Sequence, residues 1–183
     1  LERLYPGVPV AMLHTPYQED GKISPGQVEY MVKQLKEEVI PKMEKVSGKK
    51  FDMDRLSKMM VNSAKAEDLL VKILESAKHK PSPIDAYFAG VYYIGPIFTA
   101  FRGTEAAVEY YTELYNEVQE RVRLGLGPIT PEGELKEEKF RLVVEGPPNW
   151  TNFREFWKIF YDMGAVIVAS SYTKVGGVYD LGF

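Results

Sequence analysis

The first two thirds of the chain carry apolar residues at the spacing of amphipathic helices. From residue 24 to residue 124 these residues recur mostly at steps of three and four positions, which places them on one face of a helix. Ser24 can cap the first helix, Pro25 suits its first position, and Gln27 completes a capping box. Pro41 lacks the backbone N–H that a helix interior needs, so we expect a kink or an end there.

Two further helices and an aromatic segment follow. A long helix is expected from Asp52, which can cap it, to about His79, because two prolines come soon after and oppose its continuation. Residues 84–101 are aromatic and almost uncharged, and glycine and proline interrupt them, which predicts a buried, broken helix. Residues 104–124 predict another amphipathic helix.

After residue 124 the pattern changes to that of an α/β protein. Residues 140–144 predict a strand, and residues 165–169, all apolar, predict a second one. A predicted helix with an aromatic face lies between them. Asn152 and Glu155 resemble a cap and its box partner for this helix, and Gly164 marks its end. Strand, helix and strand in close succession form a βαβ unit, so we expect the two strands to be parallel.

A similar apolar run near the start, Val8 to Leu13, also predicts a strand, and Pro9 favours a strand start or an edge. The predicted fold class is therefore α/β, with parallel-sheet pieces of the Rossmann or flavodoxin type flanking a helical middle segment. We divide the chain into the end of a first α/β unit (1–23), the helical middle segment (24–124), a linker (125–138) and the start of a second α/β unit (139–183).

Both ends of the sequence suggest an internal piece of a longer polypeptide. The chain starts at Leu1 without a methionine, and no helix follows its last strand. A parallel strand needs both faces buried, so a covering element is expected elsewhere. We therefore expect a fragment of a larger subunit.

Composition removes several classes of function. The 183 residues carry a formal charge of −3 and no polybasic run, which gives no reason to expect nucleic acid or a membrane surface as a partner. Cysteine is absent, which excludes disulfides, thiol catalysis and ligation of a metal cluster by this stretch. No phosphate-binding G-x-x-x-x-G-K-[ST] loop occurs, so this chain should not hydrolyse ATP. No signal peptide or membrane-length apolar run is seen, and we expect a cytoplasmic protein.

Candidate ligand contacts come from loops beyond the carboxyl ends of the predicted strands, where open parallel sheets bind ligands. His14 follows the first strand and could donate a proton. The loop at 146–150 leads into a helix N-terminus, which favours an anion. In this loop Gly146 allows close approach to the backbone, Asn149 can donate a hydrogen bond, and Trp150 can form a flat apolar wall.

A third loop, residues 170–177, is polar and follows a very apolar strand, as ligand-binding loops often do. Its candidate contacts with a substrate are Ser171, Tyr172, Thr173 and Lys174.

Every one of these features also has a purely structural interpretation. A lone histidine near a proline, such as His14, is more often a hydrogen-bonded structural residue than a proton donor. The loops at 146–150 and 170–177 could be turns that contact no ligand. The aromatic segment at 84–101 could line an apolar pocket, but packing in the core is the more common role of such a segment. The charged run at 134–139 is expected to be a solvated face.

Two segments resemble a known enzyme family. F-R-L-V-V-E-G-P-P-N-W at residues 140–150 and A-S-S-Y-T-K-V-G-G-V-Y-D at residues 169–180 closely resemble the B-type subunits of ATP-dependent benzoyl-CoA reductases. The run at 8–17, the capped helices and the break at 80–84 resemble the wider 2-hydroxyacyl-CoA dehydratase D-component family. The resemblance runs along essentially the whole chain.

The resemblance implies an oxygen-sensitive, cytoplasmic iron–sulfur oxidoreductase of anaerobic aromatic degradation. Such an enzyme reduces the ring of benzoyl-CoA, or of a related aromatic acyl-CoA, with low-potential electrons. It implies a 4Fe–4S cluster whose cysteine ligands lie in the full-length subunit outside this stretch, so that this chain alone binds no metal and is inactive. The implied partners are a second catalytic subunit, ATP-hydrolysing iron–sulfur subunits and a ferredoxin donor. Lys174 would then face the phosphates of CoA.

One departure from the family pattern leaves two alternatives open. In many dehydratases a cluster cysteine follows the strand that matches residues 165–169, whereas this chain reads Ser-Ser-Tyr-Thr, with the matching position near Tyr172 or Thr173. The G-P-P-N-W and Y-T-K-V-G-G segments favour the reductase. The alternatives are a subunit of a lyase that dehydrates a 2-hydroxyacyl-CoA, and a non-catalytic scaffold relative without a cluster.

Overall fold

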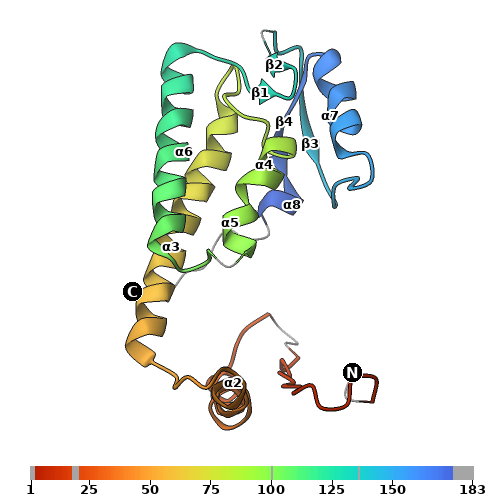
Figure 1. Ribbon diagram of the computed structural model, residues 1–183. Helices are drawn as coiled ribbons and strands as arrows, with labels where there is room; N and C mark the ends of the chain where they lie inside the picture. Colours follow the sequence, from red (N-terminus) through yellow and green to blue (C-terminus); the bar gives the residue numbers. More distant parts are fainter. Residues whose placement is uncertain (1–2, 18–20, 100, 136, 175–183) are drawn as a thin grey trace. The chain divides into compact units, whose positions relative to one another are not determined.

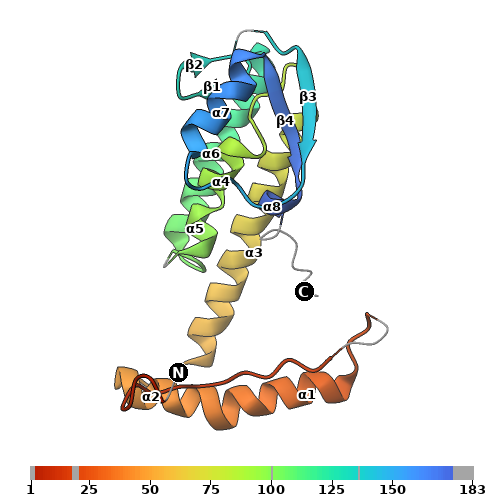
Figure 2. The same ribbon diagram turned by 90° about the vertical axis from the view of Figure 1, so that its right-hand side faces the viewer.

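The computed structural model describes residues 3–17, 21–99, 101–135 and 137–174, with only the backbone of Lys174. Contacts along the chain divide it into two compact units, Leu1–Met53 and Asp54–Phe183, called unit 1 and unit 2 below. Figures 1 and 2 show the elements of each unit from two directions. In the described part of the chain, no helix is long and apolar enough to cross a membrane.

Unit 1 contains a helix with the predicted capping box. The elements are α1 (Pro25–Gln34), a π-helical segment η1 (Leu35–Val39) and α2 (Ile40–Ser47). The Ser24 hydroxyl accepts the N–H of Gln27, and the Gln27 side chain accepts the N–H of Ser24 at 2.8 Å. Gly48 ends α2 in the left-handed conformation, with φ 67°. The predicted start and break are therefore confirmed.

Pro41 does not end the helix. It lies at the start of α2, directly after the π-helical segment, in which the N–H of Ile40 donates to the carbonyl of Leu35. A π turn widens the helix and changes which carbonyl each N–H reaches. The helix thereby continues past a residue that has no N–H to donate.

The strand predicted at Val8–Leu13 is not formed, and that prediction is wrong. These residues pair with no strand in the described part of unit 1. Side chains of the helices hold the segment instead, since Lys42 Nζ donates to the carbonyl of Val10 at 3.0 Å. A strand requires a partner for its ladder, which a local apolar run does not supply. The first of the two predicted sheet pieces is therefore absent from the described residues.

Unit 2 begins with the predicted helices. They are α3 (Met53–Glu75), a short 3₁₀ turn η2 (Ser76–Lys78), α4 (Phe88–Tyr93), α5 (Gly95–Phe98) and α6 (Glu105–Leu124). The Thr104 hydroxyl accepts the N–H of Ala107 at the start of α6. The long helix, the broken helix and the third amphipathic helix are thus confirmed, and α3 and α6 lie side by side (Figures 1 and 2).

A core of fully buried side chains joins these helices. Leu70 and Ile73 of α3 pack with Tyr111 and Val118 of α6. The Tyr111 hydroxyl donates to the carbonyl of Tyr93 at the end of α4. Burial of large apolar side chains at the predicted spacing is what stabilises this layer.

The predicted βαβ unit follows and is confirmed. β3 (Phe140–Val144) and β4 (Ala165–Ser170) are parallel, and α7 (Phe153–Asp162) connects them and covers one face of the pair. Gly164 ends this connection with φ 74°. The α/β fold class is therefore confirmed. The predicted side-chain cap is wrong, because Asn152 makes no side-chain capping bond and only its carbonyl accepts the N–H of Phe156.

The predicted linker lies inside unit 2 and contains structure of its own. β1 (Ile129–Thr130) and β2 (Gly133–Glu134) form a short antiparallel hairpin. The run at 134–139 is not simply a solvated face, because the Glu138 side chain is only 4% exposed and pairs with Arg141. The division of the chain into four segments stays a prediction.

A buried carboxylate connects the helical part of unit 2 to its sheet. Asp85 accepts the backbone N–H groups of Tyr87 at 3.0 Å and Phe88 at 2.7 Å, just before α4, and that of Ile167 in β4 at 2.9 Å. The N–H of Ala86 donates to the carbonyl of Ile167 at 2.7 Å. Burial raises the pKa of Asp85 to about 6, although the three backbone donors act to lower it. The segment before α4 is thereby fixed along β4.

Candidate functional site

The carboxyl ends of β3 and β4 bring two of the predicted loops together. Gly146 follows β3 with φ 98°, a conformation that favours glycine. Its N–H donates to the hydroxyl of Ser171 at 3.3 Å. Ser171 begins α8 (Ser171–Lys174), a single helical turn where a flexible polar loop was expected. The prediction of a flexible loop is therefore wrong for residues 171–174.

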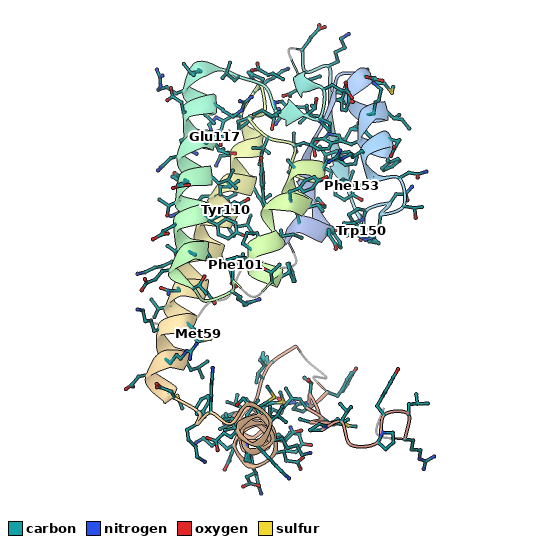
Figure 3. All side chains as sticks on the ribbon, viewed as in Figure 1. Met59, Phe101, Tyr110, Glu117, Trp150 and Phe153 are labelled. Atoms are coloured by element: carbon teal, nitrogen blue, oxygen red, sulfur yellow. The ribbon has the colours of Figure 1, made fainter. Side chains whose placement is uncertain are left out.

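Four aromatic side chains cluster beside this junction, and we call them the aromatic corner: Tyr92, Trp150, Phe153 and Tyr172. Trp150 stacks on Phe153, with ring centroids 5.9 Å apart and planes at 21°. Tyr172 meets Trp150 edge-on at 6.1 Å and 69°, and Tyr92 meets Phe153 edge-on at 5.8 Å and 70°. Trp150 is nevertheless 59% exposed, so much of its ring is open to a ligand. Figure 3 shows Trp150 and Phe153 near each other by α7 and α8.

The rest of the aromatic segment divides between core and surface. Phe88 is fully buried and stacks on Trp157 of α7, with centroids 5.3 Å apart and planes at 9°. Phe98 and Phe101 are exposed. The core-packing interpretation therefore holds for Phe88.

Thr173 is the predicted site residue that the fold buries most deeply. It is 1% exposed, and its hydroxyl donates to the carbonyl of Ala86 at 2.8 Å. This hydroxyl is therefore engaged with the protein. Asn149 is exposed and next to Trp150, which leaves its amide accessible. The side chain of Lys174 lies outside the described residues, as do residues 175–177 of the predicted loop.

His14 belongs to unit 1 and is held there by two residues of α1. Its N–H donates to the Gln34 side chain at 2.8 Å, and its carbonyl accepts from the same side chain at 2.9 Å. The imidazole Nδ1 lies 3.4 Å from the Tyr30 hydroxyl. His14 follows no strand, contrary to prediction, and its contacts favour the interpretation of a hydrogen-bonded structural residue.

A cavity of about 570 Å³ lies beside α8 and is a second place where a ligand could bind. Its wall is mostly apolar and includes Leu74, Val168 and Thr173. The volume is that of a small-molecule pocket. Arg141 also lines the cavity. Its guanidinium donates to the carbonyls of Ala77 and His79, so it is already hydrogen-bonded within the protein. Glu75 and Lys78 also line this cavity, so it is a second candidate beside the junction of Gly146 and Ser171.

The residues of this chain do not fit an iron–sulfur cluster. Such clusters need thiolate ligands, and the sequence has no cysteine. Among the described residues, no group of three or more histidines and carboxylates is placed to hold a metal ion.

Comparison with known proteins identifies the family. A family model described as 2-hydroxyglutaryl-CoA dehydratase, D-component, matches residues 1–180. The chain belongs to this family. The resemblance seen in the sequence is thereby confirmed at the level of the family.

Individual relatives differ widely in their similarity. The B-type subunit of benzoyl-CoA reductase from Thauera aromatica is 71% identical over 175 residues, which are 96% of this chain and 40% of that protein. The alpha subunit of (R)-phenyllactyl-CoA dehydratase from Clostridium sporogenes is 26% identical over 93% of this chain and 40% of that protein. The alpha subunit of (R)-2-hydroxyglutaryl-CoA dehydratase from Acidaminococcus fermentans is 28% identical, over 93% of this chain and 34% of that protein. The chain thus spans about two fifths or less of the length of these curated relatives.

Sequence reasoning missed Tyr92 and Phe153 as members of the aromatic corner, and Asp85 as the residue that fixes the neighbouring backbone. Asp85 is the one charged residue in the aromatic segment at 84–101. A lone acid in an apolar run is expected to be buried with hydrogen-bond partners, so this signal was present in the sequence.

Proposed function

We propose that this chain is part of a catalytic subunit of an oxidoreductase that reduces the aromatic ring of benzoyl-CoA or of a related aromatic acyl-CoA. One observation carries the proposal: identity is 71% to a benzoyl-CoA reductase subunit, but 26% and 28% to subunits of two dehydratases. All three alignments cover nearly the whole chain. The large difference in identity favours the reductase over the dehydratases.

In this proposal the carboxyl ends of β3 and β4 contact the acyl-CoA. Trp150 provides a flat apolar wall for the ring, and Tyr172, whose plane is inclined by 69° to that of Trp150, provides an edge-on contact. The N-terminus of α7 and the amide of Asn149 supply hydrogen-bond donors for the thioester oxygen. Lys174 would lie toward the CoA phosphates, and Gly146 with Ser171 holds the two loops together.

The electrons would come from a 4Fe–4S cluster in the full-length subunit, held by cysteines outside this stretch of sequence. The role of this chain is then to bind the thioester, to orient the ring and to exclude water. We also propose the partners that the family resemblance implies: a second catalytic subunit, ATP-hydrolysing iron–sulfur subunits and a ferredoxin donor, all in the cytoplasm. This stretch alone would be inactive.

The test is product analysis with the full-length subunit, assembled anaerobically with its partners. With benzoyl-CoA, ATP and a reduced ferredoxin, the proposal expects a product with two added hydrogen atoms, which mass spectrometry detects. Omission of ATP is the control and should abolish the product. Loss of water from a 2-hydroxyacyl-CoA, without ring reduction, would instead identify a lyase. An iron-free complex with neither activity would identify a scaffold.

A further inference from the structure

We propose that Thr173 is a positioning residue, which sets Tyr172 against Trp150 so that the aromatic corner selects a planar aryl group over a saturated one. The inference rests on the proposed function, because it assigns a specificity within the acyl-CoA site. Thr173 itself is buried and would act only through its neighbour Tyr172.

The hydroxyl of Thr173 fixes α8 to the sheet. It donates to the carbonyl of Ala86 at 2.8 Å, and the N–H of Ala86 donates in turn to the carbonyl of Ile167 in β4 at 2.7 Å. Thr173 is 1% exposed, so this hydrogen bond does not compete with water. The turn that carries Tyr172 is therefore attached to a backbone segment that β4 already holds.

The methyl group of Thr173 lies close to Gly90 of α4. A Cβ added at Gly90 in α4 would lie 2.8 Å from Thr173 Cγ2 and 3.3 Å from Thr173 Cβ. A real Cβ almost never approaches another atom to 2.8 Å, so the absence of a side chain at Gly90 leaves the space that the methyl group of Thr173 occupies. Because α8 has only four residues, fixing Thr173 also fixes the adjacent Tyr172.

The geometry of the aromatic corner suits a planar ring. Trp150 is backed by Phe153 at 21°, while the plane of Tyr172 is inclined by 69° to that of Trp150. A planar ring that stacks on Trp150 can also meet Tyr172 edge-on, and these are the two arrangements that aromatic pairs prefer. A saturated ring of similar size has no π face and gains neither contact. Two such contacts correspond to a preference of about tenfold.

Binding measurements on the assembled full-length complex test the proposal. Calorimetric dissociation constants of benzoyl-CoA and cyclohexanecarbonyl-CoA are compared without ATP, so that no turnover occurs. We expect the unchanged complex to prefer benzoyl-CoA by about tenfold. Thr173→Val keeps the shape and loses the hydroxyl, and should lose most of this preference while its affinity for the saturated thioester stays within about twofold. Thr173→Ser keeps the hydroxyl and should retain most of the preference.

If Thr173→Val does not fold, a second pair of variants tests the same proposal. Gly90→Ala should displace Thr173 and reduce the preference, and the double variant Gly90→Ala/Thr173→Ser should restore it, because serine lacks Cγ2. An unchanged preference in Thr173→Val, or an equal weakening of both ligands in every variant, overturns the positioning role. If the unchanged complex binds benzoyl-CoA but only dehydrates hydroxyacyl thioesters, the proposed function fails while the preference can still be measured.

Discussion

The carboxylate of Asp85 accepts the backbone N–H of Ile167 at 2.9 Å, although 82 positions separate the two residues in the sequence. The same carboxylate accepts the N–H groups of Tyr87 and Phe88. One buried side chain therefore joins the start of α4 to the middle of β4. Because β4 leads directly into α8, this contact also determines where the candidate site lies relative to the helices of unit 2.

Substitutions of Asp85 should destabilise the protein in a graded order. Asp85→Ala leaves three backbone donors without their acceptor, and we expect the free energy of unfolding to fall by about 3 kcal/mol. Asp85→Asn keeps an oxygen for Tyr87 and Phe88 but turns an amide nitrogen toward Ile167, so its cost should be about half as large. Urea-induced unfolding of the full-length subunit measures both. Unchanged stability in Asp85→Ala would show that these contacts contribute nothing.

Asp85 should also make stability depend on pH. Burial raises its pKa from 3.8 to about 6, so the folded protein binds this proton more tightly than the unfolded chain does. The stabilising contribution of protonated Asp85 is fully present below the pKa of the unfolded chain, 3.8, and is lost as the pH rises through about 6. The free energy of unfolding should fall by about 3 kcal/mol over this range. The comparison is with Asp85→Asn, which cannot titrate at this position. A difference in stability between the two proteins that is constant from about pH 4 to about pH 7 would contradict the prediction.

The ion pair between Glu67 and Arg102 should be sensitive to loss of the cation. Arg102 Nη2 lies 2.7 Å from Glu67 Oε1, and the Glu67 side chain is 3% exposed. Arg102→Met leaves a buried carboxylate without its counter-charge and should cost about 2 kcal/mol, less than a fully buried pair because Arg102 is partly exposed. Glu67→Gln removes the buried charge and should cost less. Thermal unfolding that ranks the two variants in the reverse order would refute this account.

Trp150 should matter more for turnover than for stability. It is 59% exposed, so Trp150→Ala should change the free energy of unfolding by less than about 1 kcal/mol. If Trp150 contacts the ring as proposed, removal of its indole should lower kcat/KM for benzoyl-CoA by about tenfold. Ile159→Ala on α7 is the matched control, with 57% exposure, and should affect neither quantity. Parallel losses of melting temperature and rate in Trp150→Ala would assign Trp150 to packing alone.

Features encoded by neighbouring residues could be predicted from the sequence. The capping box of Ser24 and Gln27 and the helix end at Gly164 are formed by residues within one turn of each other. The strands at 140–144 and 165–169 are short and, apart from Arg141, apolar, so their pairing in a βαβ unit followed directly. The same signal failed at 8–13, because an apolar run forms a strand only where a partner strand is available.

The candidate site was only partly predictable for the same reason. Trp150 and Tyr172 were expected because each follows a strand end. The roles of Tyr92 and Thr173 depend on contacts with residues far away in the sequence, which no local period reveals. Thr173 was expected to contact a ligand, yet the structure buries it against Ala86. Polar residue types in a loop indicate a possible site but not which of them face outward.

The central claim is that the carboxyl ends of β3 and β4 contact the acyl-CoA, and photo-crosslinking tests it most directly. Trp150 is replaced by p-benzoylphenylalanine in the assembled full-length complex, which is irradiated with isotopically labelled benzoyl-CoA; Ile159 is replaced in the same way as the control. Mass spectrometry should find a CoA adduct at position 150 that excess unlabelled benzoyl-CoA suppresses, and only background at position 159. Equal labelling of both positions, or none at position 150 in a complex that turns over benzoyl-CoA, would contradict the claim.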